Sequence, residues 1–338
     1  MNTVKSAVIG AGFFGGLHAR VLKNYHRSQL CIVCDKNIDQ AKLLASQLDC
    51  DYTDSIDEIT DNDQIDLVTI ATPDHAHRDP ALRVLRAKKH MFIEKPLTTV
   101  VDESLEIIEA ASKVLVKTMV DFTNRWNPPF VEAKEQLNQD VIGKPIMAYA
   151  RLNLPISSPL DMYPAWCSKS GPEWYLFPHS VDMVRWLIEE DPTSVYAVGV
   201  KKILKRKNLD SFDAIQAQAM FGDIPVALET SWVMARKNPS GLDFRVEVHG
   251  TKGTVEICTN SSGLNVATHD QFRVPLLAQL QKVHRQEVGF LTGPIQHFVD
   301  CIIEDTEPMT SLNDGLIITK FISAVRESIS KRNVVEIS

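Results

Sequence analysis

The first third of the chain alternates short apolar runs with longer segments in which apolar residues recur every three or four positions. Runs of the first kind are typical of buried β-strands, and segments of the second kind are typical of amphipathic helices. The apolar runs predict strands at residues 5–9, 30–34, 51–53, 67–71, 90–93 and 114–120. The helical pattern fills the gaps at residues 15–24, 39–47, 56–60, 79–88 and 102–112. This alternation predicts a doubly wound parallel sheet.

The pattern changes after the Asn-Pro-Pro segment at 127–129, where polar and apolar residues begin to alternate one by one. A period of two is typical of strands with a single buried face. It predicts strands at 147–154, 194–203, 214–221, 226–233, 244–248 and 254–258, with a turn at 250–253. Helices are expected at 129–137, from Phe177 onward, and at 293–304 and 314–330.

These patterns predict an α/β protein of two domains, which also suits a length of 338 residues. We expect a Rossmann domain at 1–122. A second α/β domain at 123–338 would hold a large, mostly antiparallel, open-faced sheet, and the last helix would pack back on the first domain. No predicted helix covers one face of that second sheet, although Gln216 and Gln218 make the face partly polar. A second subunit is the simplest cover, so we expect a homodimer or homotetramer.

A glycine pattern follows the first predicted strand. Gly10, Gly12 and Gly15 form a GxGxxG motif that leads into a helix. The first glycine permits a tight turn, the second lets the backbone approach a pyrophosphate, and the third allows close helix–strand packing. The N–H groups at the start of the helix can then bind phosphate. A glycine turn in an unrelated α/β protein is the alternative interpretation.

Asp35 argues against that alternative, because it ends the second strand about twenty residues after the last glycine, as the dinucleotide fingerprint requires. Its carboxylate would accept hydrogen bonds from the ribose hydroxyls and repel a 2′-phosphate. The sequence therefore predicts NAD in preference to NADP, and the neighbouring Lys36 weakens the preference slightly.

Composition and charge narrow the class of protein without naming a function. Hydrophobic content is 44% and charged content 23%, as in ordinary globular proteins. A formal charge of −7 offers no general attraction to nucleic acid or to an anionic membrane. No run of about 18 apolar residues is present, and the first strand begins too early for a signal peptide. We expect a cytoplasmic protein.

Two features could suggest metal binding, and both have a simpler interpretation. Cys31 and Cys34 form a CxxC pair inside the second predicted strand, where residues three apart point to opposite faces. No second cysteine pair completes a zinc site, so buried strand cysteines are favoured. For His75 and His77, the nearby sequence offers no third histidine and no carboxylates spaced to complete a metal-ligand set. Loop or helix-cap roles are therefore favoured for both histidines. We expect no metal.

Two segments follow predicted parallel strands at their carboxyl ends, where ligands bind in open α/β sheets. Thr72-Pro73 follows the fourth strand, at the expected meeting point of cofactor and substrate. Glu94-Lys95-Pro96 follows the fifth strand, and the Lys95 ammonium could hydrogen-bond a substrate hydroxyl or lower the pKa of a neighbouring base. A surface Glu–Lys pair is the alternative interpretation.

A third segment combines an acid and a base at a helix start. His179 lies in the first turn of the helix that begins at Phe177, and Asp182 follows three residues later on the same face. A histidine with an orienting carboxylate one turn away is a candidate general base. A helix-terminal histidine with a salt-bridging aspartate is the alternative.

Taken together, these motifs resemble the glucose–fructose oxidoreductase / inositol dehydrogenase / MocA (Gfo/Idh/MocA) family. The resemblance covers essentially the whole chain. Its motifs are GxGxxG, Asp35, the Ala-Thr-Pro segment with His77, Glu94-Lys95-Pro96, Arg125-x-Asn127-Pro128, His179-x-x-Asp182 and the 250–253 turn. The family implies a Rossmann domain, a C-terminal domain with an open sheet used for oligomerisation, and hydride transfer between NAD(P) and a hydroxyl carbon of a sugar, inositol or similar ring.

The resemblance also implies roles for individual residues. Lys95, commonly before a cis-proline, and His179 would be catalytic. The substrate would be bound by Lys95, Arg125, Tyr175, His179 and Asp182. The cofactor would be bound by Gly10, Ala11, Gly12, Phe13, Phe14, Gly15, Asp35, Lys36, Thr72, Pro73, His75, His77, Glu94, Lys95 and Thr123.

The chain departs from the family pattern at one position. The family's dehydrogenases usually carry an aspartate four residues before the histidine, and here that position is Tyr175; Glu173 is acidic but out of register. Three functions therefore remain open: an NAD-dependent polyol or sugar dehydrogenase, an enzyme that uses bound NAD transiently for glycosidic elimination, and a non-catalytic NAD- or sugar-sensing protein. Net accumulation of reduced cofactor separates the first from the second. The presence of Lys95 and His179 argues against the third.

Overall fold

The computed structural model of the chain describes residues 3–162, 166–167, 169–260, 263–284 and 286–337. They form two compact units. Unit 1 comprises Met1–Thr123 and Lys282–Thr319, and unit 2 comprises Asn124–Gln281 and Lys320–Ser338. Among the described helices, none is long and apolar enough to cross a bilayer.

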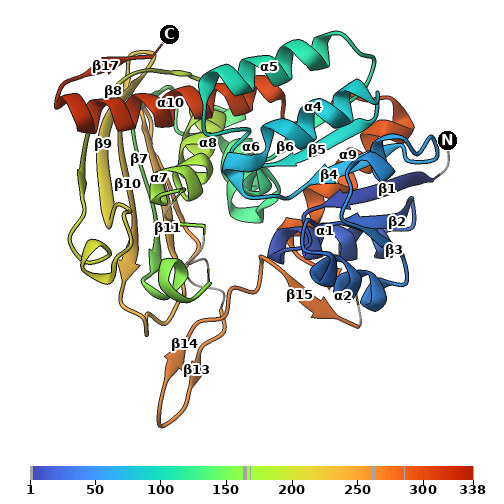
Figure 1. The fold of residues 1–338 in the computed structure, drawn as a ribbon. Coiled ribbons are helices and arrows are strands. Elements are labelled where there is room, and N and C mark those ends of the chain that lie inside the picture. The colour runs from blue at the N-terminus through green and yellow to red at the C-terminus, as the bar shows by residue number, and fades with distance from the viewer. Residues whose placement is uncertain (1–2, 163–165, 168, 261–262, 285, 338) are drawn as a thin grey trace. The chain divides into compact units, whose positions relative to one another are not determined.

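Unit 1 contains a six-stranded parallel sheet in the order β3-β2-β1-β4-β5-β6, which is the Rossmann order (Figure 1). Helices α1 and α2 lie on one face of the sheet and α4 and α5 on the other. The strands are β1 (Val4–Ile9), β2 (Ser28–Cys34), β3 (Asp51–Thr53), β4 (Leu67–Ile70), β5 (His90–Glu94) and β6 (Thr118–Asp121). The helices are α1 (Phe13–Asn24), α2 (Ile38–Leu48), α3 (Asp57–Thr60), α4 (Arg78–Arg86), α5 (Val101–Ser112) and α9 (Gly293–Glu304), with short turns η1 (Asp74–Ala76) and η5 (Phe290–Thr292).

Unit 2 is built on a seven-stranded sheet in the order β12-β11-β7-β10-β9-β8-β17. Only the β7–β10 pairing is parallel among the described pairs, so the expected mostly antiparallel sheet is confirmed. The strands are β7 (Pro145–Pro155), β8 (Pro192–Val200), β9 (Ala214–Phe221), β10 (Ile224–Met234), β11 (Asp243–Gly250), β12 (Thr254–Cys258) and β17 (Val335–Glu336). The helices are α6 (Pro128–Asn138), α7 (Pro172–Tyr175) and α8 (Phe177–Ile188), with short turns η2 (Thr123–Trp126), η3 (Ser158–Met162) and η4 (Lys205–Lys207).

Two short hairpins and a shared helix complete the chain. The hairpins are β13 (Val266–Ala267) with β14 (Phe272–Arg273) and β15 (Gln281–Val283) with β16 (Gln286–Val288). Helix α10 (Leu312–Lys331) belongs to unit 1 through residues 312–319 and to unit 2 from 320 onward. On the unit 1 side, the Thr319 hydroxyl donates to the Thr98 carbonyl oxygen at 3.1 Å.

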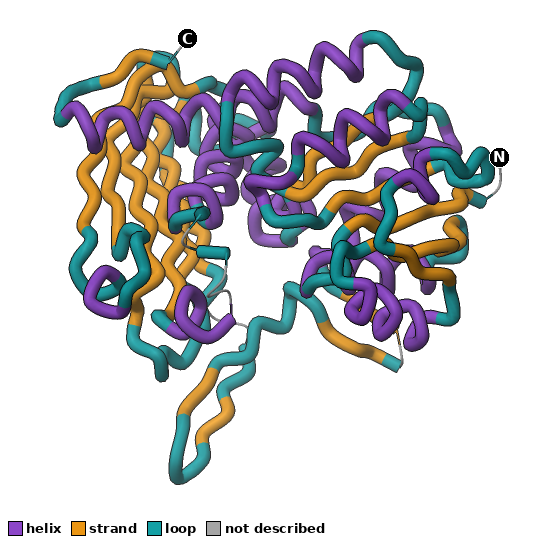
Figure 2. The backbone as a smooth tube through the Cα atoms, viewed as in Figure 1, coloured by secondary structure: helices purple, strands orange, loops and turns teal. Residues whose placement is uncertain are grey.

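The core of unit 2 lies between the inner face of its sheet and α8 (Figure 2). Pro178 in the first turn suits a helix start, because proline has no N–H to leave unpaired there. Val181, Val184 and Leu187 are buried along the helix. Residues of β9 alternate strictly, with Ile215, Ala217, Ala219 and Phe221 buried and the residues between them facing outward.

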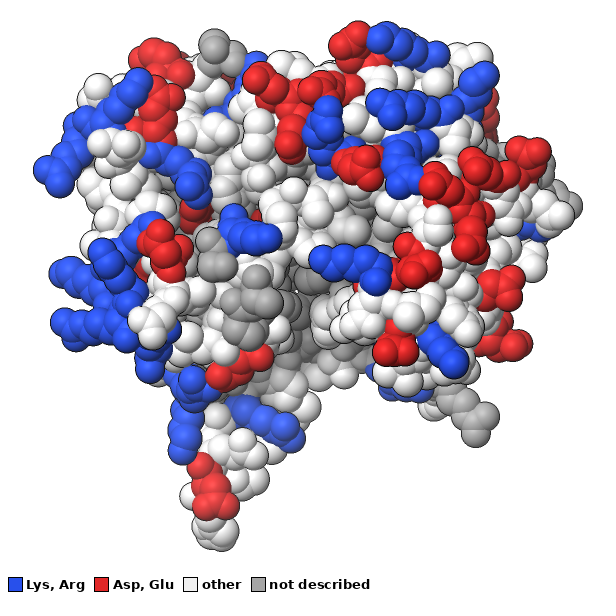
Figure 3. All heavy atoms as spheres, viewed as in Figure 1, with Lys and Arg blue, Asp and Glu red and all other residues white. Residues whose placement is uncertain are grey.

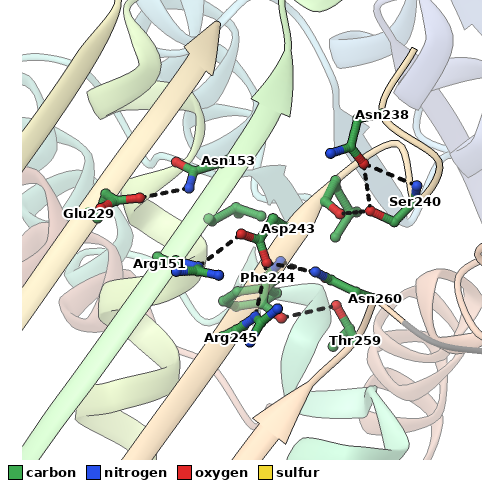
Figure 4. A network of polar contacts seen from close by, with 12 residues as sticks. Arg151, Asn153, Glu229, Asn238, Ser240, Asp243, Phe244, Arg245, Thr259 and Asn260 are labelled. Atoms are coloured by element: carbon green, nitrogen blue, oxygen red, sulfur yellow. Dashed lines mark hydrogen bonds and ion pairs between the residues drawn. The ribbon is translucent and has the colours of Figure 1, made fainter. Parts of the chain in front are cut away.

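The outer face of this sheet carries a polar network across neighbouring strands (Figure 4). Asn153 on β7 donates to Glu229 on β10 at 2.8 Å. Arg151 on β7 lies 2.8 Å from the Asp243 carboxylate on β11, which Asn260 also contacts at 2.6 Å. These contacts link β7, β10 and β11 along the sheet surface, although Arg151 Nε and Asn153 Oδ1 have no hydrogen-bond partner among the described residues.

Charge is distributed differently over the two units on the face drawn in Figure 3. In unit 1, acidic and basic side chains are interspersed, whereas in unit 2 basic side chains gather along the left edge of the view.

Two expected strand boundaries were wrong for physical reasons. The sixth strand begins at Thr118 rather than at 114, because the Val114 N–H bonds back to Ala111 as α5 ends, and Leu115 is fully exposed. The strand expected at 194–203 ends at Val200, because the Asp213 carboxylate takes the N–H groups of residues 202–204 and turns the chain.

Cys31 is half-buried and Cys34 buried, and both are free thiols. Burial raises the pKa of the Cys34 thiol to about 11. The expectation of buried strand cysteines is thus correct for Cys34 and only partly correct for Cys31.

Candidate active site

The glycine loop of unit 1 has the geometry that a dinucleotide requires. Gly10 has φ +101°, a conformation that side-chain-bearing residues rarely adopt. A Cβ on Gly15 would lie 1.6 Å from the Gly10 carbonyl oxygen, so only glycine lets α1 pack so close to β1. Beside Gly12, at the N-cap of α1, a Cβ would meet no described atom within 4 Å. The loop therefore leaves room for a phosphate at the positive end of α1.

Asp35 follows β2 and braces this loop. One carboxylate oxygen accepts the Ala11 N–H at 2.7 Å, and the other accepts the Asn37 N–H at 2.8 Å. The carboxylate is half-buried beside the glycine loop. It thus lies where the adenosine ribose of a dinucleotide is expected, with Lys36 exposed next to it.

His77 is buried and links the loops that follow β4 and β5. Its Nε2 lies 2.9 Å from the Thr72 carbonyl oxygen, and its Nδ1 lies 2.9 Å from that of Pro96. Both ring nitrogens are therefore engaged by the backbone, and His77 does not form a metal pair with His75. We expect any contribution of His77 to cofactor binding to act through the position of Thr72 and Pro73. His75 is exposed, and its Nδ1 lies 3.4 Å from Asp74.

Lys95 follows β5 directly and is almost completely buried. Its backbone N–H donates to the Glu94 carboxylate at 3.2 Å, and the Lys95–Pro96 peptide bond is cis. Burial lowers the pKa of the Lys95 ammonium, while the charges of Glu94, Asp74 and Asp121 oppose that shift. A buried amine of this kind is a typical hydrogen-bond donor to a reacting oxygen. Thr123, after β6, is buried at the same edge of the sheet.

In unit 2, His179 lies in the first turn of α8. Its Nδ1 is 3.2 Å from Nδ2 of Asn124, and the Asn124 amide oxygen accepts from Asn127 at 3.3 Å. This arrangement makes Nδ1 an acceptor, so the neutral ring carries its hydrogen on Nε2. An Asn124 amide turned by half a rotation would present its oxygen instead, so that Nδ1 would carry the hydrogen and Nε2 would be the proton-accepting nitrogen of the neutral ring. No sequence motif pointed to Asn124.

Asp182 and Arg125 form a buried, two-point ion pair. Arg125 Nη2 lies 2.7 Å and Nε lies 3.1 Å from the two Asp182 carboxylate oxygens. This pair ties η2, which carries Asn124, to α8, which carries His179. The observed contacts therefore indicate a positioning role for Arg125 and Asp182, and their assignment to substrate stays a prediction.

Tyr175 is half-buried and its ring contacts two tryptophans. The ring centroid lies 5.0 Å from that of Trp166 and 6.4 Å from that of Trp232. The nearby Glu173 is fully buried and binds Arg326 of α10 at 2.6 Å. Burial raises the pKa of Glu173. Glu173 is thus held by α10, and Tyr175 remains the residue in register with the family's aspartate.

Unit 1 also contains a buried cluster that no sequence motif predicted. His18 on α1, Glu94 and Asp121 are all buried, and each offers a ligand-type atom within 4.8 Å of the others. A histidine on the apolar face of a helix gives no sequence signal that separates it from ordinary core.

Comparison with known proteins decides the family. Residues 4–122 match the model of the oxidoreductase family with an NAD-binding Rossmann fold, GFO_IDH_MocA. Residues 130–256 match the GFO/IDH/MocA C-terminal domain. The chain belongs to the Gfo/Idh/MocA family. The resemblance noted from the motifs is confirmed, and the chain is an NAD-dependent oxidoreductase that acts on CH–OH groups.

Individual Gfo/Idh/MocA proteins align along most of the chain. Inositol 2-dehydrogenase of Rhizobium meliloti (strain 1021) is 28% identical, over 99% of this chain and all of the relative. A solved structure from Sinorhizobium meliloti 1021, described as a candidate myo-inositol dehydrogenase, has a TM-score of 0.85 at 27% identity and covers 99% of this chain and 100% of that one. A 2,7-anhydro-N-acetylneuraminate hydratase of Mediterraneibacter gnavus is 26% identical, over 76% of this chain and 68% of the relative.

Proposed function

We propose that this protein oxidises a ring hydroxyl of an inositol or a closely related cyclic polyol with NAD. The observation that carries the proposal is the buried Lys95 at the carboxyl end of β5, beside a glycine loop and an Asp35 carboxylate that suit NAD. The full-length similarity to an inositol 2-dehydrogenase supports the substrate class. NAD bound at the glycine loop supplies the hydride acceptor.

Two side chains would act on the hydroxyl. The Lys95 ammonium would donate a hydrogen bond to the oxygen and stabilise the negative charge that develops as its proton leaves. His179 would accept the proton, with Arg125 and Asp182 holding its helix in place. Tyr175 would orient a second substrate oxygen, since its phenolic O–H can donate a hydrogen bond.

The proposal is tested by screening inositols, aldoses and sugar acids for NADH formation. At least one cyclic polyol should give net NADH. His179→Ala and Lys95→Met should each lower kcat by about 10²–10⁴-fold, whereas Tyr175→Phe should raise KM more than it lowers kcat. The absence of NADH with every polyol tested would contradict the proposal.

Elimination chemistry is the second candidate, because a 2,7-anhydro-N-acetylneuraminate hydratase is among the relatives. In that case substrate would be converted with bound NAD but without net NADH. Product analysis beside the NADH measurement separates the two reactions.

We also propose that the outer face of the unit 2 sheet binds a second copy of the chain. Tyr196, Val198 and Val200 are exposed along β8, beside a hollow of about 380 Å³ lined by Asn153, Glu229 and other outward residues of the sheet. The Arg151 and Asp243 charges are already paired, as in Figure 4, and can be buried against a partner without leaving either of them unpaired. A self-complementary face of this kind suits a homodimer or homotetramer.

A further inference from the structure

Two carboxylates are forced together at the cofactor-binding edge of unit 1. Strands β5 and β6 pair in parallel with Glu94 opposite Asp121, and both side chains are buried. Like charges at facing positions of a sheet destabilise it, and in a buried site the repulsion is screened little. The pair therefore requires a proton or a counter-charge.

His18 supplies that counter-charge from α1. Its Nε2 lies 3.4 Å from Glu94 and 3.7 Å from Asp121, and the ring is fully buried. Phe92 contacts the imidazole edge-on, with the ring centroids 5.4 Å apart, which limits rotation of the ring. The two carboxylates raise the pKa of His18 to about 9 against the opposing effect of burial, which is the largest single influence. Burial raises the pKa of Asp121 to about 7.

The cluster is directly connected to Lys95. Glu94 accepts the Lys95 backbone N–H, and the charged groups that act on the Lys95 ammonium are Glu94, Asp121 and Asp74 of η1. A change in the charge of the cluster therefore acts on Lys95 at short range and in a buried setting.

We propose that His18 is a positioning residue, whose imidazolium neutralises one charge of the Glu94–Asp121 pair so that the Lys95 ammonium is available to the substrate instead of being held by the two carboxylates. This role rests on the proposed function of Lys95. With His18 charged and Asp121 ionised, which requires a pH above the Asp121 pKa of about 7, the three groups carry a net charge of −1. Without His18, the two carboxylates, once both are ionised, would carry −2, raise the pKa of Lys95 and draw its ammonium toward them.

Three variants test the charge balance. His18→Gln removes the positive charge. His18→Gln/Asp121→Asn restores the net charge of −1 with neutral amides, and Asp121→Asn alone gives a net charge of 0. We expect His18→Gln to lower kcat by about 10- to 100-fold, as is typical when an outer-shell partner is lost. The double variant should recover most of that loss, and the dissociation constant of NAD should change much less than kcat in both variants.

The pH profile of kcat separates an electrostatic role from a structural one. The limb of the profile that reports Lys95 is the one that is lost in Lys95→Met. This limb should move to higher pH in His18→Gln and to lower pH in Asp121→Asn. In the double variant it should return to its position in the unaltered protein. If His18→Gln does not fold, the shift of the Lys95 limb in Asp121→Asn still tests the proposal. A double variant no more active than His18→Gln would overturn the proposal.

The protonation of His18 can also be measured without any enzyme turnover. This measurement tests the role of His18 separately from the proposed function. In histidine-labelled protein, the NMR signal that is absent from His18→Gln should titrate near pH 9, whether or not any polyol is oxidised. Titration below pH 7 would overturn the proposal. It would also be overturned if EDTA abolished the activity and a divalent metal restored it, because the cluster would then be a metal site.

Discussion

At the scale of single residues, Asp35 makes contacts that the sequence alone did not reveal. Its two carboxylate oxygens accept the backbone N–H of Ala11 in the glycine loop and that of Asn37, two residues further along the chain. The same carboxylate is expected to accept the ribose hydroxyls of NAD, so its charge serves both the shape of the loop and the choice of cofactor.

Asp35→Asn should therefore weaken NAD binding by about 10- to 100-fold, since a hydrogen bond to a charged group is worth about 1.5–3 kcal/mol. The preference for NAD over NADP should shrink, because the repulsion of a 2′-phosphate is lost. Asp39→Asn, in the first turn of α2, removes a nearby charge and is the matched control. Titration with both cofactors measures the effect, and tighter binding of NADP than NAD by the unaltered protein would contradict the assignment.

Residue positions were predictable where a motif imposes a special backbone or a strand end. Gly10, Gly15, Asp35 and Lys95 lie where the sequence places them. Contacts between side chains that are far apart in the sequence were not predictable. Asn124 reaches His179 across 55 residues of sequence, and no pattern of polar and apolar positions encodes that contact.

At the scale of elements, long periodic segments were predicted well and chain reversals were not. Strands β3, β9 and β12 and helix α9 begin and end at the expected residues, because each has a clear period bounded by turn residues. The predicted start of β6 and the predicted end of β8 were wrong. Leu115 is exposed and lies outside β6, and the Asp213 side chain turns the chain after β8. The hairpin β13–β14 was missed because two-residue strands leave no period to detect.

The proposed interface on the outer face of the unit 2 sheet can be tested with a substitution in strand β8. Val198 is 50% exposed there, and Val198→Asp should convert an oligomer to smaller species, because it would bury an unpaired carboxylate in the contact. Val131 on α6 is 45% exposed, and Val131→Asp is the matched control. Light scattering at dilute concentration measures the mass. A monomeric unaltered protein, or an unchanged mass for Val198→Asp, would contradict the proposed interface.

At the scale of the whole molecule, the buried His18 cluster links stability to pH. His18 has a pKa of about 9 in the folded protein against 6.5 in the unfolded chain. A raised pKa stabilises the protein fully below pH 6.5, and that contribution is lost as the pH rises through 9. Asp121 acts in the same direction between about pH 4 and 7, because its pKa is also raised on folding.

We therefore expect the free energy of unfolding to fall between pH 7 and 10, with His18 contributing up to about 3 kcal/mol of that loss. Denaturant unfolding at several pH values measures it, and His18→Gln should lack most of the decline above pH 7. An equal decline in both proteins would assign the effect to other groups.

The return of residues 282–319 to unit 1 has a consequence for how the chain is made. Phe298 of α9 packs against Phe92 of β5, with the ring centroids 5.7 Å apart, and both are fully buried. The Thr310 hydroxyl bonds to the Val120 carbonyl at the end of the same sheet. A ribosome that has released residues 1–122 has thus delivered every strand of this sheet but not the helix that closes its core. Until nearly the entire polypeptide has emerged, the nascent sheet keeps an uncovered apolar surface around Phe92, of the kind that makes partly folded chains prone to aggregation.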